Sequence, residues 1–219
     1  MRVGRLSALA VIVCLATAAS ISAQMGMRSV HLPPGFFNPV MGSGASYQTI
    51  DSNGRTSGME LALIGKESVN GKDGYWIEWT MPDSSMGNIL AKELVVMGDK
   101  ITVSRVVMQM AGRPPMTMPE EMTSNLDITP SDIRAKADDL GKESITVPAG
   151  TFSCEHYRAK DSGDDTWISS KVSPIGLVKD QSADKTRTTV LIKTYTDAKD
   201  KITGTPQPFN PMMMMPPRQ

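Results

Sequence analysis

Residues 59–81 read MELALIGKESVNGKDGYWIEWTM, and this stretch decides the fold. It contains two runs in which every second residue is apolar, at Met59, Leu61 and Leu63 and then at Ile77, Trp79 and Met81. Such period-two alternation is typical of β-strands that bury one face. The intervening SVNGKDG supplies Asn-Gly and Asp-Gly, which favour tight turns. The stretch therefore predicts a β-hairpin.

Two further runs, NILAKELVVM (88–97) and KITVSRVVMQM (100–110), extend this pattern and are joined by Gly98-Asp99. Four strands joined by short turns form a meander, whose neighbours are antiparallel. Residues 101–110 carry apolar side chains on both faces. A strand of this kind is covered on both sides. We therefore expect another layer against the sheet.

Residues 117–141 predict that layer as two short helices. Pro119 and Glu120 suit a first helical turn, and Pro130 suits another. Gly141 suits a helix end. The apolar positions at helical spacing are Met118, Met122 and Leu126 in the first helix, and Ile133, Ala137 and Leu140 in the second.

Strand patterns resume downstream, separated by turn sequences. The runs are ESITV (143–147), TFSCEHYRAK (151–160), DTWISS (165–170), GLVKD (176–180) and RTTVLIKTYTD (187–197). With about nine or ten strands expected, the strand content exceeds the usual share. The predicted fold class is mainly β, with a curved antiparallel sheet wrapped around two short helices.

One part of this region also resembles a known family. Residues 141–180, GKESITVPAGTFSCEHYRAK…DDTWISSKVSPIGLVKD, are similar to exported bacterial proteins of the LolA/LppX type and their uncharacterised relatives. The shared features are VPAGTF (147–152), the strand around Trp167, and PIGLVK (174–179). The resemblance implies a half-barrel whose sheet wraps helices. It also implies a space for acyl chains and a role in lipoprotein or lipid handling in the envelope.

The first 24 residues, MRVGRLSALAVIVCLATAASISAQ, place two arginines before an apolar run and small residues. This order predicts a signal peptide over residues 1–23, cleaved near Ala23. We expect an irregular Pro/Gly-rich arm over 24–46, one half-barrel domain over 47–203 and a disordered Pro/Met-rich tail over 204–219. The protein is then periplasmic or secreted.

Without Arg2 and Arg5, 21 of the 23 basic residues remain against 23 acidic ones, a formal charge of −2. No basic stripe points to nucleic acid. The mature sequence has no apolar run long enough to span a membrane. We therefore expect no nucleic-acid partner and no transmembrane segment, and the sequence does not identify a protein partner.

A strongly curved sheet leaves a concave face that helices, lipid or water must fill. We therefore predict a non-catalytic envelope protein that binds a lipid or acyl group there. A wide hollow would favour this function, and a face filled by the protein's own side chains would favour a structural or interaction role. The candidate lining residues are Met59, Leu61, Leu63, Ile77, Trp79, Met108, Met110, Met118 and Met122.

Two alternatives remain open. Thioethers bind Cu(I), so the methionines predict a soft-metal site as a second function. The other alternative is a protein-interaction or sensory module that docks through the Pro/Gly-rich arm (24–46) and the Pro/Met-rich tail (204–219). The metal alternative rests on Met108, Met110, Met116 and Met118.

Cys154 and His156 are two apart on a predicted strand, so they share a face. A thiol and an imidazole can act as nucleophile and base or as metal ligands. No orienting third group is signalled, and a lone cysteine is usually a buried apolar residue. The acidic run 161–165 fits a turn better than a calcium loop. Glu120-Glu121 and Asp138-Asp139 are adjacent pairs near expected helix ends, where neighbouring side chains point apart, so they do not suit paired acid and base catalysis. We therefore expect no enzyme and no cofactor.

Overall fold

The computed structural model describes residues 37–84, 87–97, 101–119 and 136–210. These ranges form twelve strands and no helix. Accordingly, the described part of the chain holds no helix with the length and apolarity of a membrane span. The strands are β1 (Gly44–Ile50), β2 (Thr56–Val69), β3 (Lys72–Ser84), β4 (Gly87–Val96), β5 (Thr102–Met110), β6 (Met116–Thr117), β7 (Ala137–Val147), β8 (Gly150–Ala159), β9 (Asp165–Ile168), β10 (Leu177–Gln181), β11 (Thr188–Tyr195) and β12 (Gln207–Pro208).

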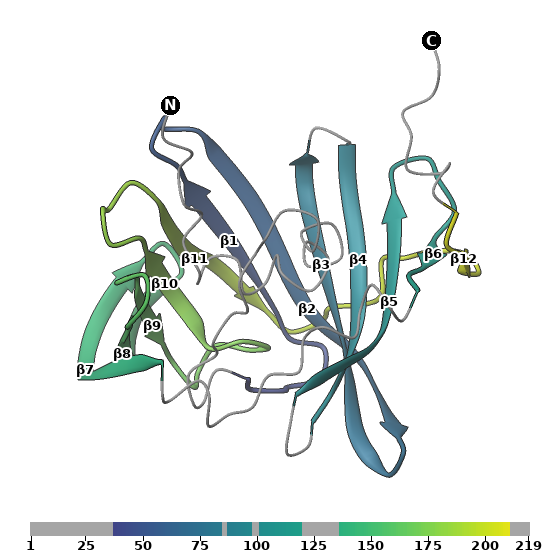
Figure 1. Ribbon diagram of the computed structural model, residues 1–219, viewed down its shortest axis with the longest axis horizontal. Coiled ribbons are helices and arrows are strands. Elements are labelled where there is room, and N and C mark those ends of the chain that lie inside the picture. Colours follow the sequence, from purple (N-terminus) through teal and green to yellow (C-terminus); the bar gives the residue numbers. More distant parts are fainter. Residues whose placement is uncertain (1–36, 85–86, 98–100, 120–135, 211–219) are drawn as a thin grey trace.

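All twelve strands belong to one sheet, in the order β12-β6-β5-β4-β3-β2-β1-β11-β10-β9-β8-β7. Neighbours are antiparallel except β6 and β12, which are parallel. The sheet is not closed, because β12 and β7 are its two edges. It bends so that β7–β11 turn away from the direction of β3–β5 (Figure 1). The prediction of a mainly β fold is confirmed. The sheet was predicted to be antiparallel, and it is mixed because β6 and β12 pair in parallel.

The β2–β3 hairpin confirms the turn expected from the sequence. Val69 pairs with Lys72, so Asn70 and Gly71 form a two-residue turn. Their φ angles are 51° and 77°. Asparagine and glycine tolerate this left-handed conformation at both central positions better than other residues do.

The prediction of the second helix is wrong from residue 137 to its expected end at Gly141. These residues belong to β7 (137–147), which pairs with β8. Gly141 has a φ of 93°, and the register skips Leu140, which is 47% exposed. A glycine with positive φ ends a helix or forms a β-bulge equally well, which explains the error. Met118 follows β6 and is not helical. The remaining helical positions, Met122, Leu126 and Ile133, lie outside the described residues.

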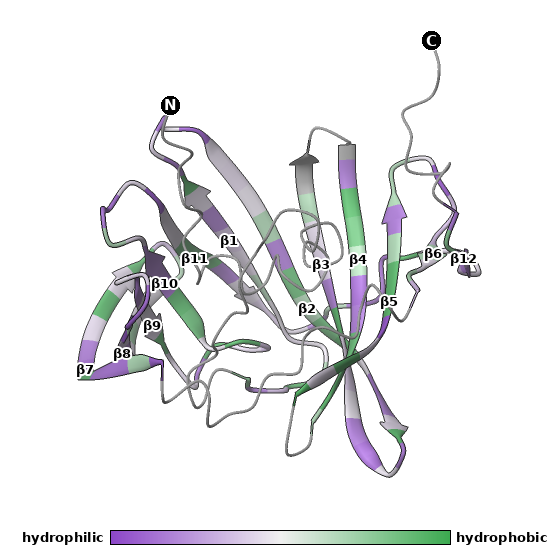
Figure 2. Ribbon diagram, in the orientation of Figure 1, coloured by the Kyte–Doolittle hydropathy of each residue, from purple (hydrophilic) through white to green (hydrophobic). Residues whose placement is uncertain are grey.

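Residues that pair directly across antiparallel strands lie on the same face of a sheet. One such row crosses six strands, and we call the face that carries it the inner face and the opposite one the outer face. Figure 2 shows hydrophobic residues interspersed with hydrophilic ones along these strands. The row consists of Ala45, Leu61, Trp79, Ala91, Met108 and Met116.

The C-terminal segment 197–208 crosses the outer face. Ala198 donates its N–H to the carbonyl of Gly42 beside β1, and Gln207 donates to the carbonyl of Pro115 beside β6. The predicted tail begins at residue 204, and the structure describes its first residues through Asn210, including β12. This segment therefore joins the outer sides of strands that lie far apart in the sheet.

Candidate functional site

The predicted lining residues of β2, β3 and β5 lie on the inner face. They are buried, with exposures of 0% to 5%, except the half-buried Met59 and Ile77. Met122 lies outside the described residues. The buried members are Leu61, Leu63, Trp79, Met108, Met110 and Met118.

The part of the inner face around Trp79 is filled by the protein itself. Leu61 and Trp79 share a buried cluster with Trp167, Ile175 and Val178 from the other half of the sheet. Their close packing leaves this end as an ordinary protein core. Among the described residues, the predicted hollow is therefore not found beside Trp79, and by the criterion given above this filled part of the face favours a structural role.

The part of the inner face over β4–β6 forms a separate, smaller cluster. We call its buried residues Ile89, Val106, Met108 and Met118 the methionine cluster. Phe209 and the half-buried Met81 and Val103 pack against it. Met116, fully buried, pairs directly with Met108. The structure thus brings the methionines of the candidate metal site to one face, although the sequence separated them into strand and helix.

Glu93 lies on the inner face between the two clusters. It pairs with Ile77 on β3 and with Val106 on β5, and it is 3% exposed. Burial raises its pKa to about 8, against the opposing effect of a hydrogen bond from the Trp79 side chain. Its Oε1 has no hydrogen-bond partner. Near neutral pH this carboxyl is therefore mostly protonated and neutral.

The sequence reasoning did not single out Glu93. The signal was present, because Ile89, Ala91 and Glu93 alternate on one side of β4 and the first two are apolar. A charged residue in step with a buried face has to be paired or neutralised. The residue was missed because glutamate usually marks the solvent face of a strand.

Glu78 is the corresponding buried carboxylate of the outer face. It pairs with Lys92, one step along from the pairing of Ile77 with Glu93, and it is 1% exposed. It accepts hydrogen bonds from the backbone N–H groups of Lys201 at 2.9 Å and Ile202 at 3.3 Å. Burial raises its pKa to about 7, with a further contribution from Asp200. This carboxylate therefore holds the C-terminal segment to the sheet.

Cys154 is buried in the core, and His156 contacts an aromatic ring and two carboxylates. Cys154 is 1% exposed, and burial followed by the nearby Glu143 raises its thiol pKa to about 11. His156 stacks on Trp167 with ring centroids 4.4 Å apart. Its Nδ1 lies 3.0 Å from Glu143 and its Nε2 2.9 Å from Asp165. The thiol is therefore protonated at neutral pH, and both imidazole nitrogens have carboxylate partners.

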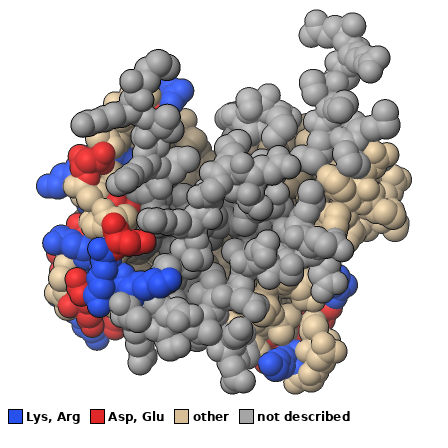
Figure 3. Space-filling model, viewed as in Figure 1, with Lys and Arg blue, Asp and Glu red and all other residues tan. Residues whose placement is uncertain are grey.

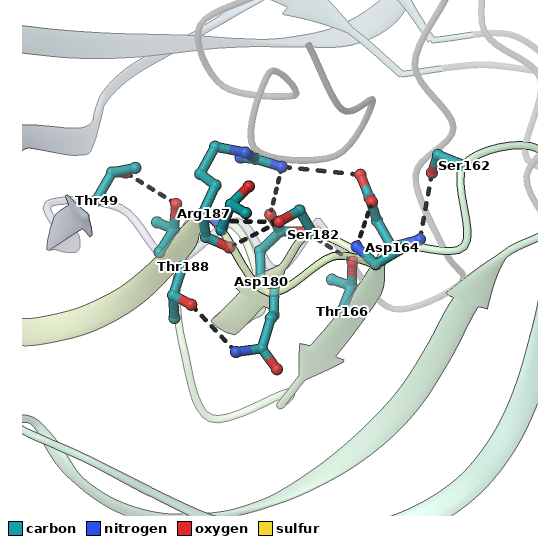
Figure 4. A network of polar contacts seen from close by, with 12 residues as sticks. Thr49, Ser162, Asp164, Thr166, Asp180, Ser182, Arg187 and Thr188 are labelled. Carbon is teal, nitrogen blue, oxygen red and sulfur yellow. Dashed lines mark hydrogen bonds and ion pairs between the residues drawn. The ribbon is translucent and has the colours of Figure 1, made fainter. Parts of the chain in front are cut away.

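A buried ion cluster joins β9, β10 and the residue before β11 (Figure 4). Arg187 lies 3.2 Å from Asp180 and 3.8 Å from Asp164, and both carboxylates are at most 1% exposed. Burial raises the pKa of Asp180 to about 6 although Arg187 opposes it. Thr166 donates to Asp180 at 3.1 Å. The acidic run 161–165, read as a turn, thus also supplies part of a buried network.

Charge is unevenly distributed on the face shown in Figure 3. Charged side chains gather over β7–β10, and the described surface beside β5, β6 and β12 is mostly uncharged. Within the described residues, no group of three or more histidine, cysteine, aspartate or glutamate side chains is placed to hold a metal ion. A site for a hard or borderline cation has no support in this part of the chain.

Comparison with known proteins gives distant likenesses only. No family model and no curated protein matches the sequence. Among solved structures, a Bacteroides fragilis protein described as exported, with a YmcC-like fold, is 10% identical with a TM-score of 0.39, over 73% of this chain and 98% of that one. A Parabacteroides distasonis protein described as a lipoprotein is 15% identical with a TM-score of 0.39, over 75% and 99%.

The MucA/MucB complex of Pseudomonas aeruginosa is also similar, at 10% identity and a TM-score of 0.40, over 72% of this chain and 52% of that one. This chain therefore spans about half the length of that structure's matched chain. Likenesses at this level support no argument about function. The resemblance of residues 141–180 to LolA/LppX proteins is not shown by them and stays a prediction.

Proposed function

We propose that this is an exported, non-catalytic protein that binds an apolar guest, a lipid or an acyl group, at the methionine end of its inner face. The observation that carries the proposal is the pair of inner-face clusters with Glu93 between them. One cluster is a filled core around Trp79, and the other contains Met108 and Met118 and lies near a sheet edge.

The methionine cluster is the end of the face that can make room. Methionine has three rotatable side-chain bonds and a polarizable sulfur, so it repacks around varied shapes at low cost. Met108, Met116 and Met118 are at most 5% exposed, so a guest has to displace them rather than enter an open hollow. Each acyl methylene removed from water contributes roughly 0.8 kcal/mol, so a long chain offsets this rearrangement.

Solvent extraction of the exported, purified protein followed by mass spectrometry tests the proposal. We expect a co-purified lipid, or uptake of dodecylpyrene with an increase in its fluorescence. An extract without lipid, together with no uptake by protein that remains folded, would exclude an apolar guest.

Two neighbouring positions supply a matched pair of variants. Met118 belongs to the methionine cluster, whereas Thr117 pairs with Val107 on the outer face. We expect Met118→Gln to weaken dodecylpyrene binding and Thr117→Gln to leave it unchanged, with folding of both checked by circular dichroism. Equal effects of the two variants would place the guest elsewhere.

A second candidate is soft-metal binding, which the pairing of Met108 with Met116 favours. Both residues are at most 4% exposed, and Met118 packs in the same cluster as Met108. Thioether ligands in an apolar site suit Cu(I).

Anaerobic Cu(I) titration against a competing chelator separates the two candidates. The test protein changes Met108, Met110, Met116 and Met118 to leucine, a substitution close in volume. Loss of Cu(I) affinity supports the metal site, and unchanged affinity removes it. If the wild type takes up neither lipid nor Cu(I), the interaction or sensory function becomes the better proposal.

A further inference from the structure

We propose that Glu93 donates a hydrogen bond to the carbonyl oxygen of the guest, so that the site selects acyl esters or acids over plain hydrocarbons. This inference rests on the proposed function and specifies the chemistry of the guest. It assigns a role to a buried polar side chain that the fold leaves incompletely satisfied.

The position of Glu93 matches the boundary between a rigid and an adaptable surface. On one side its partner Ile77 packs against the filled core, and on the other its partner Val106 belongs to the methionine cluster. An acyl chain over Met108 and Met118 reaches Glu93 when its first carbon points toward Val106, the cluster residue that pairs directly with Glu93. The apolar chain and its polar end then meet matching surfaces.

The hydrogen bonds already made by Glu93 define what is missing. One carboxyl oxygen receives the hydrogen bond of Trp79, and Oε1 has no partner. A protonated carboxyl has one O–H to donate, and a buried donor without an acceptor costs free energy. A carbonyl oxygen is an acceptor without charge, and it enters an apolar site more easily than an ion does.

Burial raises the pKa of Glu93 to about 8, so the carboxyl is mostly neutral at pH 6 and mostly ionised at pH 9. The other titratable side chains in the buried cluster with Trp79 are Tyr47, Cys154 and Tyr157. Burial raises the pKa of Tyr47 and that of Cys154, and Tyr157 donates its hydroxyl to Glu155. The methionine cluster and the residues packed on it contain no titratable group. Burial and the hydrogen bond from Trp79 set the pKa of Glu93, and no described cation contributes to it.

Three fluorescent probes that differ only at the end of the chain test the inference. They are dodecylpyrene, pyrenyldodecanoic acid and the methyl ester of that acid. Wild type, Glu93→Gln and Glu93→Leu are titrated with each probe at pH 6 and pH 9. The Glu93→Gln variant keeps a neutral donor at both pH values, whereas the Glu93→Leu variant keeps only apolar contact.

For the wild type at pH 6 we expect the ester to bind better than dodecylpyrene. We expect Glu93→Leu to bind the ester about five- to tenfold more weakly and dodecylpyrene unchanged, as for loss of one hydrogen bond. Ester affinity of the wild type should fall between pH 6 and pH 9 because an ionised carboxylate has no proton to donate. Glu93→Gln should show no such fall. If Glu93→Leu does not fold, the wild type and Glu93→Gln carry the test.

The two proposals fail in different ways. If no probe binds any folded variant, the apolar site itself is refuted. If dodecylpyrene and the ester bind the wild type equally, and Glu93→Leu changes neither affinity, an apolar site exists but Glu93 does not hydrogen-bond the carbonyl oxygen. Tighter binding of the acid than of the ester at pH 6 identifies a free fatty acid as the preferred source, and the reverse identifies an ester.

Discussion

Glu78 and Glu93 lie on neighbouring strands, one on each face of the same sheet, and both are almost completely buried. Glu78 is held by backbone N–H groups of the C-terminal segment, at Lys201 and Ile202. Glu93 receives one hydrogen bond from Trp79 and has an unpartnered oxygen. Oε1 of Glu78 also lacks a hydrogen-bond partner, so the two carboxyls differ in their other oxygen, which accepts from two backbone N–H groups in Glu78 and from one side chain in Glu93. Glu78 faces the C-terminal segment and has a structural role, whereas Glu93 faces two apolar clusters and is the candidate binding group.

The largest expected effect concerns the pH dependence of stability at Glu93. Burial raises its pKa from 4.5 to about 8 in the folded protein. The folded state therefore keeps a proton that the unfolded state loses, so this contribution is fully present below about pH 4.5 and is lost as pH rises through 8. At 1.36 kcal/mol per pKa unit, a difference of about 3.5 units corresponds to a loss of about 5 kcal/mol by pH 9.

Glu93→Gln removes this dependence because an amide does not ionise. We expect the variant to match the wild type within about 1 kcal/mol at pH 5, and to exceed it increasingly toward pH 9, in urea unfolding curves. A stability difference that stays constant from pH 5 to pH 9 would show that Glu93 is not a buried, protonated acid.

The next largest effect should come from the outer face. Glu78→Leu leaves the N–H groups of Lys201 and Ile202 without their acceptor, which we expect to cost about 2 to 3 kcal/mol in the free energy of unfolding. Glu78→Gln keeps a carbonyl acceptor and serves as the control. Hydrogen exchange at residues 201–202 should accelerate in Glu78→Leu only. Unchanged exchange in both variants would contradict the role of Glu78 in holding this segment.

The smallest effect is expected at Asp200, which forms an ion pair with Lys92 and raises the pKa of Glu78. This ion pair is partly exposed, so Asp200→Asn should change stability by less than about 1 kcal/mol. The pKa of Glu78 should fall because a neighbouring negative charge is removed. A carbon-13 shift titration measures this directly, and an unchanged or higher pKa would show that Asp200 and Glu78 are not in contact.

The sequence predicted best what depends on local chemistry. Alternation located the strands, and Asn70-Gly71 located the turn between β2 and β3. It failed at Gly141, because a preference for positive φ does not distinguish a helix end from a bulge. The helical spacing of Ala137 and Leu140 rested on few residues, and the pairing of β7 with β8 overrode it.

The candidate site was less accessible to sequence reasoning because it depends on pairing between distant strands. That the named residues of β2, β3 and β5 share one face followed from alternation alone, and their role in lining a ligand site stays a prediction. The direct pairing of Met108 with Met116, and the place of Glu93 between two clusters, follow from register. The contact of Glu78 with residues 201–202 spans more than 120 positions in the chain, and no local pattern encodes it.

The central claim is that Glu93 is a neutral donor available to a guest on an apolar face. Its most direct test is a carbon-13 titration of the Glu93 carboxyl, with and without the methyl ester of pyrenyldodecanoic acid. We predict a pKa near 8 in the free protein and a higher value with the ester bound, because an acceptor stabilises the protonated form. A carboxyl that titrates near 4.5, or whose pKa is unmoved by a bound ester, would contradict the claim.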